Sequence, residues 1–292
     1  MIVLSPGRSH SSIVTAMIGS HPDLYGFPEL ILFDRPTLGE RLDAGPRLGK
    51  PRPGWNPVPG LERAVAELHH GAQGADEIAA ARRWLEQRRA WSGADVMDHL
   101  LELVEPRTGV EKSPDTVNGE ACLGRALSAY PRARFVHFVR HPVTAQRSLQ
   151  RQLLLYDRPI PCAKAWLNQH RRILAFRAQL SADQSLLVRT EAVLNEPREQ
   201  LRRIAGWLGL RVDEAAIDAM CHPERSPYAS VGVDGERGGN DPAFLRDPVP
   251  HAVELPPTLE HPKGWLIPEE LERDIVDLAE QLGYSAPAES GR

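Results

Sequence analysis

The chain has 292 residues, of which 41% are hydrophobic and 25% are charged, and its formal net charge is −4. This composition is ordinary for a globular protein, and a mildly acidic chain argues against general nucleic-acid binding, which favours a basic surface. No run approaches the ~18 apolar residues of a membrane span, and the first apolar stretch stops at Pro6, which leaves no signal-peptide pattern. The cysteines are odd in number and widely spaced, at Cys122, Cys162 and Cys221. We therefore expect a cytoplasmic protein with no metal centre, no membrane span and no nucleic-acid partner.

The first 30 residues predict a strand, a short loop and a helix. Residues 2–4 are apolar and long enough only for one buried strand, and residues 5–10 break that strand. The helix that follows places four apolar side chains on one face: Ile13, Val14, Met17 and Ile18. A helix that begins directly after such a loop offers free backbone N–H groups and the positive end of its dipole to an anion.

Charged and hydroxyl side chains strengthen this prediction of an anion-binding loop. Arg8 can add charge, and further hydrogen bonds can come from Ser9, Ser11 and Ser12. The loop is not a Walker A loop, because it lacks the second Gly and the Lys of that pattern. An ordinary strand-to-helix turn remains the alternative at this point.

Residues 35–105 predict an insert between the first and second parts of the sheet. Its beginning, residues 35–60, is rich in Pro and Gly, and helical patterns follow at 61–70, 75–91 and from a cap at Ser92 to Val104. A loop this long is usually functional or mobile. We interpret it as a lid or an acceptor-binding segment, and a disordered surface excursion is the alternative.

The rest of the chain predicts an α/β fold with a central, mostly parallel sheet and helices on both faces. Strands are expected at 108–112, 134–140 and 186–189, and helices at about 115–130, from 142 onward, 161–181 and 194–208. In such sheets ligands bind beyond the carboxyl ends of the strands. Arg8, Lys112 and Arg140 all fall at predicted strand ends, so three cations are expected to converge at one edge.

The C-terminal part contains less regular structure. An irregular loop is expected at about 223–264, followed by a final amphipathic helix over 268–282 and a frayed tail at 286–292. We expect residues 1–285 to form a single domain.

The motifs of the chain, taken in order, resemble those of sulfotransferases that use 3′-phosphoadenosine-5′-phosphosulfate (PAPS). The similar stretches are SPGRSHSSIVTAMIGSHPDLYGFPEL from Ser5, VEKSPDT from Val110, RARFVHFVRHPVTAQRSL from Arg132, LLVRTEAVLNEPREQLRRIAGWLGL from Leu186 and HPKGW from His261. The resemblance spans about residues 1–283 and implies a P-loop-like three-layer fold.

The resemblance also implies roles for individual residues. The loop that would hold the 5′-phosphosulfate comprises Gly7, Arg8, Ser9, His10, Ser11 and Ser12. Arg140 with Ser148 would bind the 3′-phosphate, and Lys263 with Gly264 would add a further contact there. Lys112 would stabilise charge on the oxygen that bridges sulfate and phosphate, and no metal is required. The product would be 3′,5′-adenosine bisphosphate (PAP).

The proton acceptor is expected to be Glu29. Transfer to a hydroxyl needs a base within hydrogen-bond reach of the acceptor oxygen. Cytosolic sulfotransferases place a His two residues after the Lys, where this chain has Pro114, whereas the branch that resembles tyrosylprotein and carbohydrate sulfotransferases uses a Glu after the first helix. The alternatives are His10, His137, or a Glu29 that only orients Lys112.

Several residues depart from the family pattern. His10 and Ser11 stand where Gly and Thr are usual, so the loop must adopt its shape without the flexible Gly. Thr190 replaces a Tyr, and Pro262 precedes Lys263 where an Arg is common.

The acceptor is expected to be a small molecule with a hydroxyl group. Aromatic residues of the insert and the later loop could form its pocket: Trp55, Trp84, Trp91, Tyr228 and Phe244. Residues 226–228 and 239–242 faintly resemble bacterial sulfotransferases of natural-product pathways, some of which act on carrier-bound acyl chains, which suggests an acyl carrier protein as a partner.

The alternatives to a sulfotransferase are a P-loop kinase or nucleotidase that uses ATP and magnesium, and a sulfotransferase-like nucleotide-binding protein without catalysis. The sequence gives no indication of oligomeric state.

Overall fold

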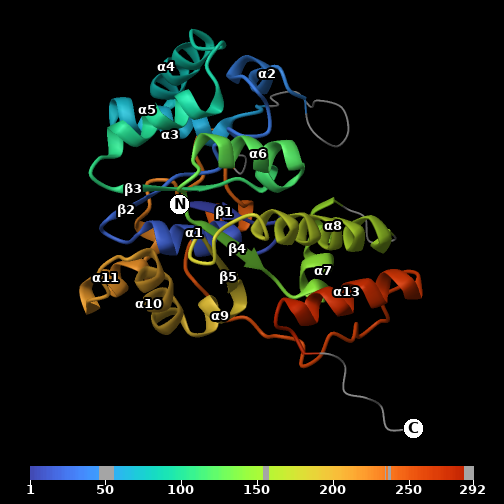
Figure 1. The fold of residues 1–292 in the computed structure, drawn as a ribbon. Helices are drawn as coiled ribbons and strands as arrows, with labels where there is room; N and C mark the ends of the chain where they lie inside the picture. The colour runs from blue at the N-terminus through green and yellow to red at the C-terminus, as the bar shows by residue number, and fades with distance from the viewer. Residues whose placement is uncertain (46–55, 154–157, 234, 236–237, 286–292) are drawn as a thin grey trace, which may run out of the picture.

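The described part of the chain is built on a five-stranded parallel sheet (Figure 1). The computed structural model describes residues 1–45, 56–153, 158–233, 235 and 238–285. Its strands are β1 (Ile2–Leu4), β2 (Leu24–Gly26), β3 (Thr108–Lys112), β4 (Phe135–Val139) and β5 (Ser185–Arg189), in the order β2-β3-β1-β4-β5. Every strand pair is parallel, so all five carboxyl ends meet at one edge of the sheet.

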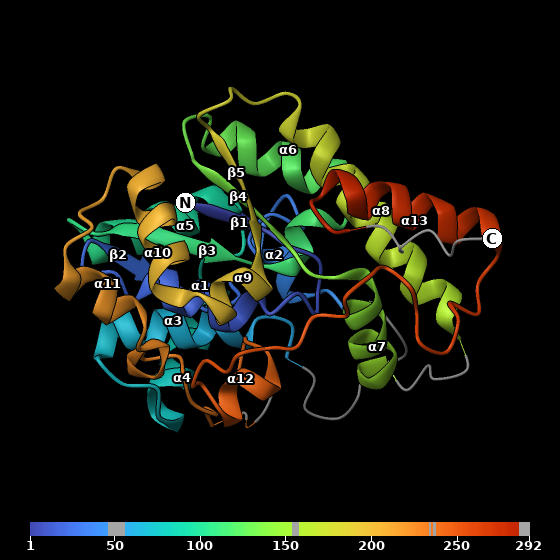
Figure 2. The ribbon, with the colours of Figure 1, turned by 90° about the horizontal axis from the view of Figure 1, so that it is seen from below.

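Helices cover both faces of this sheet (Figures 1 and 2). One face packs against α1 (Ser11–Gly19), α9 (Thr190–Asn195), α10 (Pro197–Leu208) and α11 (Glu214–Met220). The other face packs against α6 (Glu120–Ala129) and α8 (Pro159–Arg177). At the side of α8 lie α7 (Pro142–Leu153) and α13 (Glu269–Gln281). The predicted three-layer α/β fold is confirmed.

The alternation of side chains along the strands distributes the core between these two faces. Val3 of β1 packs with α1, whereas Ile2 and Leu4 pack with α6 and α8. In β3 the same alternation separates Lys112, whose ammonium reaches Ser12 of α1, from its neighbour Glu111. The register pairs Val3 with Lys112 across the two strands.

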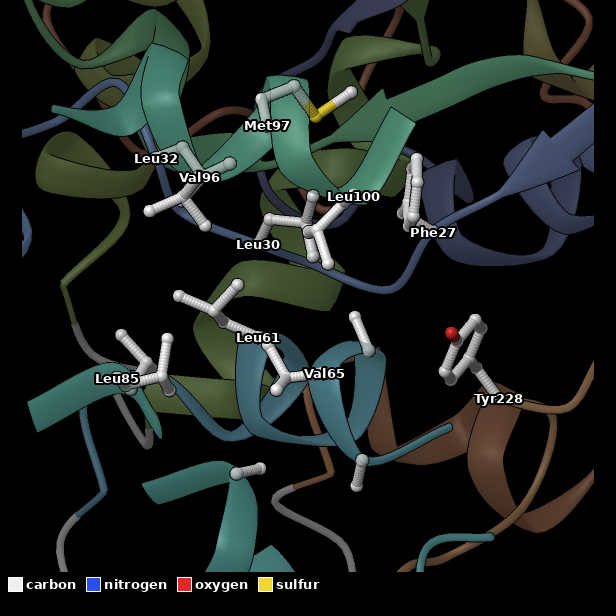
Figure 3. Close-up of a cluster of buried hydrophobic side chains, with 14 of the residues drawn as sticks. Phe27, Leu30, Leu32, Leu61, Val65, Leu85, Val96, Met97, Leu100 and Tyr228 are labelled. Carbon is white, nitrogen blue, oxygen red and sulfur yellow. The ribbon is translucent and has the colours of Figure 1, made fainter. Parts of the chain in front are cut away.

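The insert forms a helical layer beside the β2 edge of the sheet. It consists of α2 (Leu38–Leu42), α3 (Pro59–His70), α4 (Ala75–Glu86) and α5 (Gly93–Val104). Figure 3 shows the segment that carries Phe27, Leu30 and Leu32 running between α3 below it and α5 above it. A capping box begins α5, because Ser92 and Asp95 exchange hydrogen bonds, as the predicted cap requires.

Some predicted helix boundaries are wrong for local reasons. The helix predicted at 115–130 is a 3₁₀ turn, η1 (Pro114–Val117), followed by α6, because Asn118 and Gly119 interrupt it. The helix predicted over 194–208 is interrupted before Pro197. This proline is instead the first residue of α10, a position where its lack of an N–H costs no hydrogen bond. The helix predicted at 75–91 ends at Glu86.

The long loop expected at 223–264 contains two short helical elements, η2 (Pro223–Arg225) and α12 (Pro242–Arg246). Two predictions lie outside the described residues: the frayed tail at 286–292, and the part of the Pro- and Gly-rich run at 46–55, with Trp55. Across the described ranges, no helix is long and apolar enough to cross a membrane.

Candidate active site

The loop between β1 and α1 adopts a strained backbone at the carboxyl edge of the sheet. Arg8 has a φ of 67° and His10 a φ of 53°, both in the left-handed region that favours glycine. His10 occupies the position where the family that the sequence resembles usually has Gly. The positive φ of His10 gives the physical reason for that preference. Ser9 of the loop is buried, and so are Ser11 and Ser12, with which α1 begins.

Arg8 is the centre of a cluster of polar contacts. Its Nε donates to Ser148 Oγ at 3.0 Å, and its guanidinium forms an ion pair with Asp241. Its backbone carbonyl accepts from Arg140 Nη1 at 2.9 Å. The structure therefore brings together three residues that the sequence assigned to donor binding, Arg8, Arg140 and Ser148.

Lys112 joins this loop to the segment that follows β2. Its Nζ donates to Ser12 Oγ at 3.0 Å and also contacts the carboxylate of Glu29. The Lys112 side chain is 1% exposed and that of Glu29 is 22% exposed, so the acid is the more accessible partner of this pair. One ammonium thus links the anion loop with the candidate base.

The ionisable groups of the site are shifted by burial and by one another. Burial raises the pKa of Glu29, Lys112 counteracts this by attraction and hydrogen bonding, and Asp115 and Asp241 raise it further. Burial, with Arg140 and Arg8 close by, lowers the pKa of His10 to about 3, so this imidazole is neutral near pH 7.

A basic cleft of about 600 Å³ opens beside Arg140. Lys263 and Gly264 line it together with Arg140, and further cations come from Arg147 and Arg151 of α7. Among the described residues, its lining contains no Asp or Glu. Burial lowers the pKa of Arg140 to about 10, which leaves it charged at neutral pH. The cleft therefore provides a positive surface suited to a dianionic group.

A second, smaller pocket of about 260 Å³ is lined by Arg8 and Arg140 and by two acids, Asp241 and Asp247. Its wall combines His10 and Ser12 with apolar side chains, which are Ile13, Leu194, Phe244, Val249 and Val253. An apolar wall beside a cationic loop suits a ligand with a flat or apolar part and an anionic part.

Asp241 is the functional candidate that the sequence analysis missed. Besides its ion pair with Arg8, its backbone N–H donates to Ser12 Oγ at 3.0 Å, and its Oδ1 caps α12 through Ala243 N at 2.8 Å. The Asp-Pro pair before α12 is a helix-start signal. That signal predicts the cap but not the partner, because Arg8 lies 233 positions away.

Other candidate residues lie away from this cluster. His137 lies inside β4 and contacts His170, its Nε2 2.9 Å from His170 Nδ1, with both rings fully buried.

The aromatic residues expected in an acceptor pocket are spread over several places. Trp84 and Trp91 gather in the insert, where Trp84 stacks on His99. Tyr228 is buried, and its hydroxyl contacts that of Tyr25 at 2.8 Å. Of the aromatic residues expected in an acceptor pocket, Phe244 lines a cavity beside Arg8. Among the described residues, no cluster of three or more His, Cys, Asp or Glu side chains could hold a metal ion.

The comparisons with known proteins identify the family and the fold of the chain. The model of the sulfotransferase family matches residues 1–214. A sulfotransferase domain from the curacin biosynthetic pathway superposes with a TM-score of 0.74 at 22% identity, covering 98% of each chain. The sulfotransferase domain of the Synechococcus PCC 7002 olefin synthase superposes with a TM-score of 0.71 at 27% identity, covering 98% of this chain and 94% of that one. The search of curated proteins found no match. Because the family model matches well over half of its length, this chain belongs to the sulfotransferase family.

Proposed function

We propose that this sulfotransferase moves a sulfuryl group from PAPS to a hydroxyl group, with Glu29 as the base. The observation that carries the proposal is the position of Lys112, whose ammonium contacts both Ser12 of the anion loop and the carboxylate of Glu29. This arrangement puts a candidate electrostatic catalyst between a donor site and a base.

The residues around the loop fit PAPS as the donor. Ser9 Oγ is buried without a hydrogen-bond partner in the described structure, which is unusual unless a ligand supplies one. Arg8 and the loop from Gly7 to Ser12 would hold the 5′-phosphosulfate. Arg140 with Ser148, and Lys263 with Gly264, would hold the 3′-phosphate. This is supported by the basic cleft that Arg140, Lys263 and Gly264 line together with Arg147 and Arg151.

The reaction needs one proton transfer and charge stabilisation at the leaving group. The acceptor oxygen forms a bond to sulfur, the bond from sulfur to the bridging phosphate oxygen breaks, and Glu29 takes the hydroxyl proton. Lys112 attracts the carboxylate and so opposes the effect of burial on its pKa, which keeps Glu29 able to accept that proton. The same ammonium stabilises negative charge that develops on the leaving phosphate oxygen.

We propose a small or carrier-bound hydroxyl compound as the acceptor. The proposal is supported by the likeness to the olefin synthase domain, which at 27% identity comes from a biosynthetic enzyme. An acyl carrier protein is then a candidate partner. A cytoplasmic location remains part of the proposal and agrees with the free thiols of Cys122, Cys162 and Cys221.

A thermal-shift panel distinguishes this proposal from its alternatives. We expect PAP to raise the melting temperature, AMP to raise it less because it lacks the 3′-phosphate, and ATP with magnesium to have little effect. Stabilisation by ATP with magnesium but not by PAP would favour the kinase alternative. Turnover is then measured with ³⁵S-labelled PAPS against simple phenols and hydroxyacyl pantetheine thioesters. Binding of PAP without turnover on any hydroxyl compound would favour the non-catalytic alternative.

A further inference from the structure

The segment that carries Glu29 makes a strained turn two residues later. Ile31 has a φ of 55°, in the left-handed region where a β-branched residue is rarely found. Strained positions of this kind persist only where the surrounding structure holds them, and they cluster at active sites. The turn at Ile31 therefore needs anchors on both sides.

Two anchors come from the insert and the loop before α12. Leu30 and Leu32 are buried between α3 and α5, as Figure 3 shows. The Glu29 amide donates to the carbonyl of Gly239 at 2.7 Å. The Glu29 carbonyl lies so close to α3 that a Cβ on Gly60 would come within 2.3 Å of it. These contacts fix the residues on either side of Ile31.

The third anchor comes from the end of β3 and holds Ile31 itself. The Ile31 amide donates to Ser113 Oγ at 2.8 Å, and the Ser113 hydroxyl donates to Oε1 of Glu111. Ser113 and Glu111 are both fully buried. Because a hydroxyl has one proton, donation to Glu111 turns the lone pairs of Ser113 toward the Ile31 amide.

Burying the Glu111 carboxyl beside Ser113 costs folding free energy, which suggests a role for these two residues beyond stability. Oε2 of Glu111 has no hydrogen-bond partner, and burial raises the pKa of this carboxyl to about 7. A buried carboxyl that is only half satisfied is unfavourable for folding. Its place in the chain is informative, because Lys112, which contacts the Glu29 carboxylate, lies between Glu111 and Ser113.

We propose that Ser113 and Glu111 are positioning residues that hold the turn at Ile31 and thereby keep the Glu29 carboxylate beside Lys112. The inference rests on the proposed function, since it gives these residues a part in the same reaction. Neither residue is assigned a contact with donor or acceptor. The end of β3 is thus connected twice to the segment that carries Glu29. The Lys112 ammonium contacts the Glu29 carboxylate, and the Ser113 hydroxyl binds the amide of Ile31.

The decisive comparison is Ser113→Ala against Thr116→Val. Thr116 lies three residues later, is equally buried, and its hydroxyl has no hydrogen-bond partner, so Thr116→Val removes a hydroxyl without removing the anchor. For Ser113→Ala we expect kcat on the best phenol or pantetheine thioester to fall about 10- to 100-fold, as for a small misplacement of a catalytic group. The KM for PAPS and the Kd for PAP should stay within about twofold of wild type, because the donor loop is untouched. Hydrogen exchange at the Ile31 amide should accelerate.

Glu111→Leu and Glu111→Gln provide the second test. Leu removes the acceptor of the Ser113 proton, so we expect the same loss of kcat without a loss of thermal stability. Gln keeps an oxygen acceptor and should retain most of the turnover. If Glu111→Leu does not fold, Ser113→Ala decides alone.

The inference is overturned if Ser113→Ala keeps wild-type kcat, if it loses PAP binding in the same proportion, or if Thr116→Val loses as much activity. Failure of the proposed function is a separate result, in which wild-type protein shows no turnover on any hydroxyl probe. The exchange rate of Ile31 in Ser113→Ala then still decides whether Ser113 holds the turn, and an unchanged rate contradicts it.

Discussion

The guanidinium of Arg8 is paired with the carboxylate of Asp241, although the resemblance assigns Arg8 to an anionic donor. Both side chains are partly exposed, at 20% and 25%. A carboxylate of the chain itself therefore competes with the donor for the same cation.

Removing that carboxylate should tighten donor binding. Asp241→Asn keeps the cap of α12, because Asn is as good an N-cap as Asp. A partly exposed ion pair is worth about 1 kcal/mol, so the Kd for PAP should fall about fivefold. Calorimetric titration measures this directly. Asp247→Asn is the matched control, since Asp247 lines the same pocket but pairs with His251. Weaker or unchanged PAP binding in Asp241→Asn would contradict the competition.

Separating Lys112 from Glu29 should destabilise the fold. Lys112→Met leaves the Glu29 carboxylate in a desolvated site without its cation, which costs about 3 kcal/mol in comparable buried pairs. Adding Glu29→Gln should recover part of this loss, because the uncompensated charge is then removed. Urea unfolding of the two single variants and the double variant gives the coupling free energy. Strictly additive effects would mean that the two side chains do not stabilise each other.

The backbone of the donor loop predicts that glycine at position 10 gives a more stable protein than alanine. His10→Gly and His10→Ala both remove the imidazole, but only Gly adopts a φ of 53° without strain. The left-handed conformation costs an L-residue about 1 kcal/mol, so His10→Gly should be the more stable variant by about that amount. Thermal and chemical unfolding of the pair measures the difference. Equal stability, or a more stable Ala variant, would show that the loop relaxes away from this conformation.

Buried neutral histidines make stability depend on pH. Burial lowers the pKa of His170 to about 3, against about 6.5 in an unfolded chain. Between these values the unfolded state binds a proton that the folded state does not, so stability is full above about pH 6.5 and is lost as the pH falls toward 3. His170→Gln should reduce the slope of unfolding free energy against pH by up to about 1.4 kcal/mol per unit. Asn168→Gln, at an exposed position of the same helix, is the control and should leave the slope unchanged, because it removes no titratable group. An unchanged slope in His170→Gln would contradict the assignment.

The 3′-phosphate assignment predicts a change in ligand preference rather than a general loss of binding. Lys263→Gln should weaken PAP binding about fivefold, which corresponds to about 1 kcal/mol, and should leave AMP binding unchanged. Lys164→Gln, on an exposed position of α8, is the control. Equal weakening of PAP and AMP would exclude a specific contact with the 3′-phosphate.

The sheet and the convergence of cations could be predicted from the sequence. Short apolar runs that alternate with helical patterns specify a parallel sheet, and the strand ends then bring Arg8, Lys112 and Arg140 to one edge. The fold class and the family are confirmed. The single-domain organisation and the roles of the site residues remain predictions.

The contacts that complete the site could not be predicted in the same way. Asp241 meets Arg8, and Ser113 meets Ile31, through turns whose local patterns specify a cap or an end of strand but no distant partner. The left-handed φ of Ile31 is not coded by any Gly or Asn at that position. Such contacts follow from how loops that are distant in the sequence pack together at the edge of the sheet, which a periodic pattern does not specify.

The central claim is that Glu29 takes the proton of the acceptor hydroxyl, and Glu29→Gln tests it most directly. The amide keeps an oxygen for Lys112 Nζ, so the fold and the Kd for PAP should be retained within about twofold. General-base catalysis is worth 10²–10⁴-fold, so transfer of ³⁵S from PAPS should fall by about 100-fold or more. Glu102→Gln, on the exposed side of α5, serves as the control with full turnover expected. Wild-type turnover in Glu29→Gln would contradict the account and remove Glu29 as the base.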